Sequence, residues 1–256
     1  MDMLLLRVAL APLLVALSTA AQRRWGHAVG GSLAGLPLTS GPVVVVVLLQ
    51  HGAQFTATTA AAMVTGLLSG VAFCAGYALA SHRADWRRSL LCALTSFAVS
   101  TLVLWLSSPS LLPSLLLLLL GLPLVLRLWP DRGSPGADLP ERAAVGMACR
   151  MTCAAAAVLL LTGVSGLLGP WLAGLLAPLQ VIAGVLAVCT HRAGGARAAR
   201  RFLRGVVRGG FAFAAFCTVL ALALPRWNAA PTFIAATCAA LAVQTCVLLR
   251  PVRRSS

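Results

Sequence analysis

The stretch VVVVVLLQHGAQFTATTAAAMVTGLLSGVAFCAGYALA, residues 43–80, contains no charged side chain, and its most polar part surrounds His51. Two apolar runs, 29–49 and 54–80, therefore meet at a short polar connection. A helix that spans a bilayer needs about 20 apolar residues, whereas barrel strands alternate in polarity, which these runs do not. Similar runs recur along the chain and predict nine transmembrane helices, at 3–21, 29–49, 54–80, 89–107, 111–128, 147–167, 170–190, 204–224 and 229–249.

The composition also favours a lipid bilayer as the environment of the chain. The chain of 256 residues is 60% hydrophobic and only 10% charged, with a mean hydropathy of +0.94. Soluble domains carry about 25% charged residues. The net charge of +15 comes from arginines at the ends of apolar runs, so we interpret them as topology signals and phospholipid contacts rather than as a nucleic-acid surface. The predicted fold class is all-α, a polytopic integral membrane protein of the cytoplasmic membrane.

The arginines divide unevenly between the two sides of the predicted helices. One side receives only Arg7 and Arg226, while Arg150 and Arg208 fall within or at the edge of runs, from which their side chains are expected to snorkel. The positive flank at 23–24 follows the first apolar run, unlike that of a secretory signal peptide. By the positive-inside rule the N-terminus is outside and the C-terminus is cytoplasmic. The other side receives sixteen arginines: Arg23, Arg24, Arg83, Arg87, Arg88, Arg127, Arg132, Arg142, Arg192, Arg197, Arg200, Arg201, Arg204, Arg250, Arg253 and Arg254.

A polar linker at 129–142 divides the chain into two halves that resemble one another. We predict a first four-helix repeat at 1–110, a linker helix with a cytoplasmic loop at 111–142, and a second four-helix repeat at 143–256. Because the connecting helix is a single one, the two repeats are expected to lie in inverted orientations across the membrane, as in many transporters. The repeat is predicted from matches 139 residues apart: Leu33–Leu36 with Leu172–Leu175, Gly66 with Gly205, and Gly70 with Gly209.

Two predicted helices are interrupted at corresponding places, and we take these breaks as the candidate substrate site. Proline and glycine remove backbone hydrogen bonds from a helix, and paired interruptions are typical of transporter binding sites. The alternative is a pair of kinked helices whose hydroxyls bond their own backbone. The candidate residues are Pro37, Thr39, Ser40, Gly41 and Pro42 in the first break, and Pro178 and Gln180 in the second.

The polar connection after the second predicted helix is a further candidate. Gln50, His51 and Gln54 could line a mouth on the outer face, or they could belong to an ordinary solvated hairpin. Small residues four apart allow helices to approach closely. We therefore assign Gly66, Gly70, Gly205 and Gly209 to helix packing across the repeat interface.

Several functional classes lack their signatures. No Asp or Glu lies within an apolar run, which argues against a carboxylate-driven cation antiporter. No phosphate-binding glycine loop, zincin motif or nucleophile elbow occurs. The eight cysteines have no metal-ligand spacing. We expect no enzyme activity, no catalytic residue, no metal and no cofactor.

The segments GGSLAGLPLTSGP, residues 30–42, and GLLSGVAFCAGYA, residues 66–78, resemble the small four-helix inner-membrane proteins of the GlpM-like kind. The resemblance covers about one half of the chain for each copy and implies a tandem fusion of two four-helix units. It carries no catalytic residue across.

These patterns predict a membrane transporter or permease-like protein for a neutral, anionic or lipid-like solute. The alternative is a non-catalytic membrane subunit or scaffold, which docks partner helices through glycine-rich faces and anionic lipid through arginines. The expected partners are membrane lipids and either a second copy of the chain or another membrane protein, with no nucleic acid.

Overall fold

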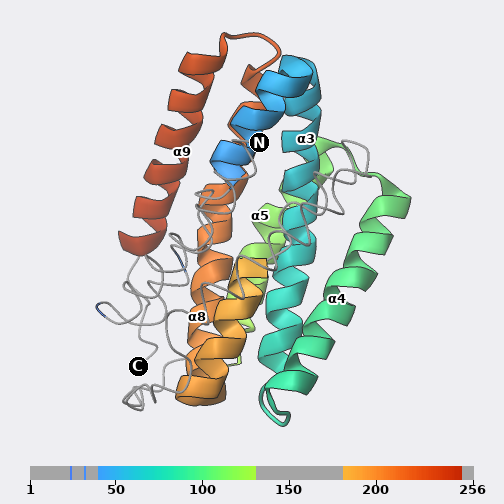
Figure 1. Cartoon of the computed structure of the whole chain (residues 1–256), viewed down its shortest axis with the longest axis vertical. Coiled ribbons are helices and arrows are strands. Elements are labelled where there is room, and N and C mark those ends of the chain that lie inside the picture. The colour runs from blue at the N-terminus through green and yellow to red at the C-terminus, as the bar shows by residue number, and fades with distance from the viewer. Residues whose placement is uncertain (1–23, 25–31, 33–39, 131–180, 250–256) are drawn as a thin grey trace.

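The structure is a computed structural model that describes residues 40–130 and 181–249, together with Arg24 and Ser32. The predicted helices at 3–21 and 147–167, residues 29–39 of the run 29–49 apart from Ser32, and residues 170–180 lie outside the described residues. The described part is all-α (Figure 1). Its helices are α3 (Ser40–Ala80), α4 (Trp86–Ser107), α5 (Leu111–Arg127), α8 (Val181–Ala223) and α9 (Ala229–Leu249).

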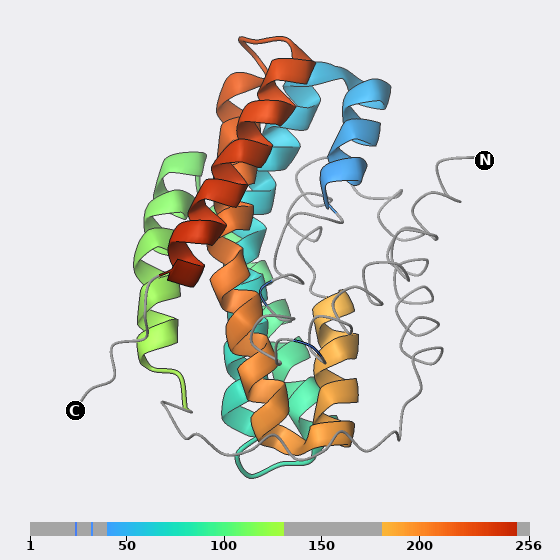
Figure 2. The same cartoon turned by 90° about the vertical axis from the view of Figure 1, so that its left-hand side faces the viewer.

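Helices α3 and α8 each contain a sharp turn at one glycine. Gly52 has φ 81° and ψ 176°, and Gly195 has φ 81° and ψ 177°. This backbone conformation is essentially restricted to glycine. Each helix therefore consists of a short arm before the glycine and a long arm after it (Figure 2). The turn at Gly52 lies in the predicted connection between the runs 29–49 and 54–80.

The second turn corrects the sequence prediction. The predicted runs 170–190 and 204–224 leave an arginine-rich connection from His191 to Arg204, but α8 is helical on both sides of Gly195. Arginine is a good helix former, and its long apolar stem can cover a helix surface. A cluster of arginines is therefore compatible with helix, and the charge alone does not mark a loop.

The two glycine turns belong to a larger correspondence at a spacing of 143 residues. Gly52 and Gly195 have this spacing, as do the ends of α3 and α8 and the starts of α4 and α9. We call residues 40–107 the first unit and residues 181–249 the second unit. The turns after the long arms repeat the same bonds: the Arg83 and Ala84 amides donate to Ala80 O at 3.1 and 3.0 Å, and the Arg226 and Trp227 amides to Ala223 O at 2.9 and 2.8 Å.

The spacing of 143 residues differs from the spacing of 139 predicted for the repeat. At 143 residues Ala72-Phe73-Cys74 matches Ala215-Phe216-Cys217, and Gly66 matches Gly209 rather than Gly205. The spacing of 139 came from short matches of Leu, Ala and Gly, which recur by chance in so biased a composition. The backbone turns are more specific because only glycine adopts them.

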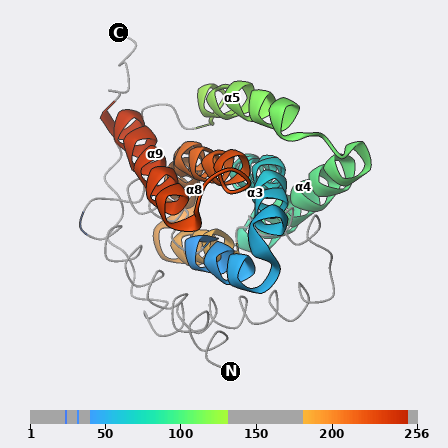
Figure 3. The same ribbon diagram turned by 90° about the horizontal axis from the view of Figure 1, so that it is seen from above.

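The long arms of α3 and α8 form the centre of the molecule, and α4, α5 and α9 stand around them (Figure 3). Four described helices are long and apolar enough to cross a membrane: Val47–Ala80, Trp86–Ser107, Ala183–Ala223 and Ala229–Val247. Large apolar side chains remain exposed on the outer helices, including Leu106, Leu120 and Ile234. A surface of this kind suits lipid, and these helices indicate a multi-pass membrane protein.

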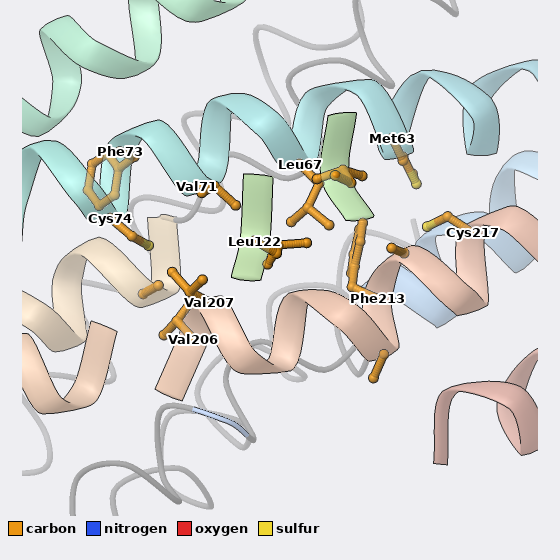
Figure 4. Packing of buried hydrophobic residues seen from close by; sticks show 14 of the residues in the cluster. Met63, Leu67, Val71, Phe73, Cys74, Leu122, Val206, Val207, Phe213 and Cys217 are labelled. Carbon is orange, nitrogen blue, oxygen red and sulfur yellow. The ribbon is translucent and has the colours of Figure 1, made fainter. Parts of the chain in front are cut away.

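The two long arms lie side by side and run in opposite chain directions (Figures 1 and 2). Apolar side chains fill the space between them, among them Leu67, Val71 and Phe213, with Leu122 from α5 (Figure 4). A Cβ on Gly210 would lie 3.7 Å from Leu67 Cδ1 and 3.3 Å from Leu122 Cδ2. Leu67 and Gly210 are equivalent at the spacing of 143, so the arms meet at equivalent residues.

Candidate functional site

The meeting point of the arms defines a central level for the molecule. Leu67 is fifteen residues after Gly52, and Gly210 is fifteen residues after Gly195. Each distance is about 22 Å along a helix. Because the arms are antiparallel, the two glycine turns lie on opposite sides of this level and about 45 Å apart. That separation is close to the thickness of a bilayer with its headgroup regions.

The two ends of the molecule differ in charge. The turns at Gly195 and at 81–85 lie at one end, with the end of α5, and the turns at Gly52 and at 224–228 lie at the other (Figures 1 and 2). Among the described residues near these turns, the second end has only Arg226, and we call it the arginine-poor end. The arginine-rich end has Arg83, Arg87, Arg88, Arg127, Arg192, Arg197, Arg200 and Arg201.

Polar contacts join the two units at the arginine-rich end. The Tyr77 hydroxyl lies 3.0 Å from His191 Nδ1, with the rings edge to face. Arg200, which is only 5% exposed, donates from Nη1 to Ser81 O at 3.2 Å and to Ser81 Oγ at 3.3 Å. The Arg192 guanidinium lies 5.5 Å from the Trp86 ring centroid, within the range of a cation–π contact. We call these three pairs the arginine-end contacts.

The same positions at the arginine-poor end are apolar. Tyr77 corresponds to Leu220 and His191 to Leu48, while Ser81 corresponds to Leu224 and Arg200 to Ala57. Apolar side chains at these positions can form no hydrogen bond between the units. The side chains at these equivalent positions are therefore polar at the arginine-rich end and apolar at the arginine-poor end, although the glycine turns and several helix boundaries coincide.

Polar side chains also occur close to the central level. Thr65 Oγ1 and Ser114 Oγ lie 2.7 Å apart and join α3 to α5, and both residues are fully buried. Ser69 is fully buried too, and its Oγ has no hydrogen-bond partner among the described residues. A buried hydroxyl is costly unless it is hydrogen-bonded, and of these three residues only Ser69 lacks a partner among the described residues.

Arg208 is the charged residue nearest the central level in the described part of the chain. It lies two residues before Gly210, which places its Cα about 3 Å from that level. Its side chain is half-buried. Asp85 is the sole acidic residue among the described residues, and it lies at the arginine-rich end. Among them, no carboxylate stands at the level of Arg208.

The predicted substrate-site residues fall into two groups. Pro37, Thr39, Pro178 and Gln180 lie outside the described residues. The remainder of the first break, Ser40, Gly41 and Pro42, forms the first turn of α3. A Cβ on Gly41 would meet no described atom within 4 Å, so this glycine is not required by close packing there.

The other predicted residues are exposed at the tip of the Gly52 turn. Gln50, His51 and Gln54 are all accessible, and the His51 ring stacks on Phe55 with centroids 4.4 Å apart. The threonine hydroxyls that follow bond their own helix, as Thr56 Oγ1 does to Gly52 O at 2.8 Å. These residues lie at the arginine-poor end, about 22 Å from the central level, and do not join the polar groups there.

The glycines predicted to pack between helices are all buried: Gly66, Gly70, Gly205 and Gly209. The contact shown by the structure between the long arms uses a different glycine, Gly210, against Leu67. The search for glycines four residues apart selected Gly205 and Gly209. It did not select Gly210, which directly follows Gly209 in the chain. The helix-packing role of the four predicted glycines stays a prediction.

The comparisons with known proteins add no assignment. No protein-family model, no curated protein and no solved structure matches the chain. The resemblance to GlpM-like proteins therefore stays a resemblance, and much of its first segment, 30–42, lies outside the described residues.

Sequence reasoning missed the arginine-end contacts and treated Arg208 only as a snorkelling side chain. The partners Tyr77 and His191 are 114 residues apart in the chain, and no local pattern links them. The spacing of 143 would have placed Arg208 opposite Thr65 in the alignment of the units. That register depends on recognising Gly52 and Gly195 as turns.

Proposed function

We propose that the chain is a membrane transporter or permease-like protein built from two inverted-topology repeats, the first and second units. The arginine-rich end faces the cytoplasm, and the solute site lies at the central level of the molecule. Inverted repeats of known transporters place their substrate near the bilayer midplane, where the repeats meet.

One observation carries this proposal, namely the exchange of charge between equivalent positions. In the second unit Arg197, Arg200 and Arg201 follow the glycine turn, whereas the first unit has Gln54, Ala57 and Thr58 there. After the long arm the difference reverses, as Arg87 and Arg88 correspond to Ala230 and Pro231. Two units with the same backbone and opposite orientations would need this exchange to satisfy the positive-inside rule.

A labelling experiment tests the orientation. Gln54→Cys and Arg197→Cys place single thiols at equivalent, exposed positions beside the two glycine turns, in a background whose native cysteines are replaced by alanine. In intact cells a membrane-impermeant thiol reagent should modify the thiol at position 54. It should modify the thiol at position 197 only after the membrane has been permeabilised. Equal labelling of both positions from outside would contradict the inverted orientation.

A second experiment tests transport through the centre. Ser69→Cys is nearly isosteric, and the thiol would lie about 3 Å from the central level, fully buried in the present conformation. A transporter that opens alternately exposes its centre to each side in turn, so impermeant reagents applied from either side should modify this thiol. The control is a chain in the same alanine background that retains Cys74 as its single thiol, which is also fully buried and lies farther from the central level. If no reagent reaches position 69 from either side, the scaffold function becomes the better explanation.

A further inference from the structure

Three arginines of α8 lie in a row that approaches the central level. Arg201, Arg204 and Arg208 are spaced at i, i+3 and i+7, so they share one face of the helix. They precede Gly210 by nine, six and two residues, which places their Cα atoms about 13, 9 and 3 Å from the central level. All three are half-buried.

The row lies on the side of α8 turned away from α3. Successive residues of a helix are about 100° apart, so Arg208 points about 160° away from Gly210, which contacts Leu67 of α3. The row is therefore separate from the apolar contact between the long arms. It is also distinct from the arginine-end contacts, which involve Arg192 and Arg200.

The fold itself does not require these charges. The equivalent positions of the first unit are Thr58, Ala61 and Thr65, and the first unit has the same glycine turn and the same helix ends. Charged side chains within the hydrocarbon core are costly, and they commonly mark paths for substrates or ions. Arg201 lies near the glycine turn and also contributes to the positive-inside pattern, but charges as deep as Arg204 and Arg208 on one unit only indicate function rather than architecture.

Snorkelling does not account for Arg208. Its Cα lies about 12 Å from the nearer boundary of a hydrocarbon core about 30 Å thick, if that core is centred on Leu67 and Gly210. This distance is greater than the reach of an arginine side chain. Arg201 lies close to the boundary, and its side chain can reach the headgroup region.

We infer that this row is an anion path, and that Arg208 binds the anionic group of the solute at the central level. The inference rests on the proposed transport function and names its substrate class. A guanidinium offers five donors in a planar fork, which matches two oxygens of a carboxylate or phosphate. Arg201 and Arg204 provide positive charge along the way from the arginine-rich end. The anionic group belongs either to a free anion or to a lipid headgroup.

Ligand-induced stabilisation of the purified full-length protein tests the site. A ligand that binds the folded state raises the unfolding temperature in a concentration-dependent way. Inorganic phosphate is one probe, and phosphatidylglycerol in neutral-detergent micelles is the other. At least one probe should stabilise the protein, and Arg208→Gln should weaken its apparent affinity by about ten- to a hundredfold, as expected for a lost hydrogen bond to a charged group. A response to phosphate identifies a free anion, and a response to phosphatidylglycerol alone identifies a headgroup.

Matched variants separate binding from general damage. Arg226→Gln removes an exposed arginine at the arginine-poor end and should leave the response unchanged. Arg208→Lys keeps the charge and should lose only a few-fold in affinity. If Arg208→Gln does not fold, Arg204→Gln on the same face should still show a loss of several-fold. No stabilisation by either probe, or the same response in the Arg208 and Arg204 variants as in the native chain, would overturn the inference.

Flux measurements distinguish this inference from the proposed function. Proteoliposomes that contain the native chain or Arg208→Gln are assayed for entry of labelled phosphate and for movement of labelled phosphatidylglycerol between leaflets. Movement that is lost in Arg208→Gln supports both proposals. Movement that persists unchanged in Arg208→Gln leaves transport standing and refutes the anion site. Binding that depends on Arg208 without any movement leaves the anion site standing and refutes transport of these solutes.

Discussion

The first and second units share their glycine turns and several helix boundaries but differ in their side chains, and the difference is concentrated in polar residues. Glycine turns, helix ends and the bonds that close the turns coincide at a spacing of 143 residues. Most of the charges do not coincide, since Arg197, Arg204 and Arg208 stand where the first unit has Gln54, Ala61 and Thr65. We therefore attribute the shared backbone features to the requirements of the fold. We attribute the differences in polar residues to the orientation and function of each unit.

The strongest test of the shared backbone concerns the two glycine turns. Gly52 and Gly195 adopt the same positive φ, which strains any residue with a Cβ. Gly52→Ala and Gly195→Ala should each lower the unfolding free energy by about 1–3 kcal/mol, and the double variant by about the sum, since the turns are far apart. Unfolding titrations with SDS in mixed micelles would measure this.

Gly41→Ala is a suitable control for the turns, because a Cβ there meets no described atom within 4 Å and the residue is helical. It should be neutral or slightly stabilising. A clear difference between the alanine variants at 52 and 195 would mean that the two turns are not equivalent in energy.

The next test concerns the contact between the long arm and the following helix, where the two units have side chains of different size. A Cβ on Gly76 would clash with Ser96 Oγ and approach Cys92 O to 3.1 Å. The second unit has Val219 and Ala239 at the positions of Gly76 and Ser96. Gly76→Ala should cost about 1–3 kcal/mol through overpacking, measured by the same SDS titration.

The second unit also suggests how to relieve that cost. Ser96→Ala removes the closest atom, so Gly76→Ala combined with Ser96→Ala should recover part of the lost stability. Ser96 Oγ bonds its own helix, at 2.8 Å from Cys92 O, and its removal alone should have a small effect. Equal costs for the single and double variants would show that the backbone of Cys92, rather than Ser96, limits the approach.

The helices and their order are predictable from the sequence because continuous apolar runs of about 20 residues have one solution in a bilayer. The runs 89–107, 111–128 and 229–249 agree with α4, α5 and α9 to within a few residues. The start of the long arm of α8 was missed because arginines within a helix resemble a loop in composition. The described polar groups at the centre were missed because they come from distant parts of the chain, as Thr65 and Ser114 do.

A smaller effect is expected at the arginine-end contacts. Tyr77→Phe removes the hydroxyl that lies 3.0 Å from His191 Nδ1 and should cost about 0.5–1.5 kcal/mol. His191→Leu introduces the residue found at the equivalent Leu48, and it leaves the Tyr77 hydroxyl without this partner. The combined Tyr77→Phe and His191→Leu variant should cost less than the sum of the two, because no polar group is then left unpaired.

A double-mutant cycle on these two positions gives the coupling directly. Additive costs would show that the hydroxyl and the imidazole contribute independently. In that case the difference between the two ends of the molecule would be one of charge alone.

The smallest effect is expected at the residue before α4 and α9, where the two units have the chemically related residues Asp85 and Asn228. Asp85 precedes α4, and its carboxylate accepts from the Arg88 amide at 3.3 Å, whereas Asn228 precedes α9 at the equivalent position. Asparagine and aspartate cap helices about equally well. Asp85→Asn should therefore change the unfolding free energy by no more than about 0.5 kcal/mol, compared with about 1 kcal/mol for Asp85→Ala. A larger loss in Asp85→Asn than in Asp85→Ala would mean that the negative charge matters more than the cap. Asp85 would then act mainly by balancing the surrounding arginines, a task that Asn228 does not have at the arginine-poor end.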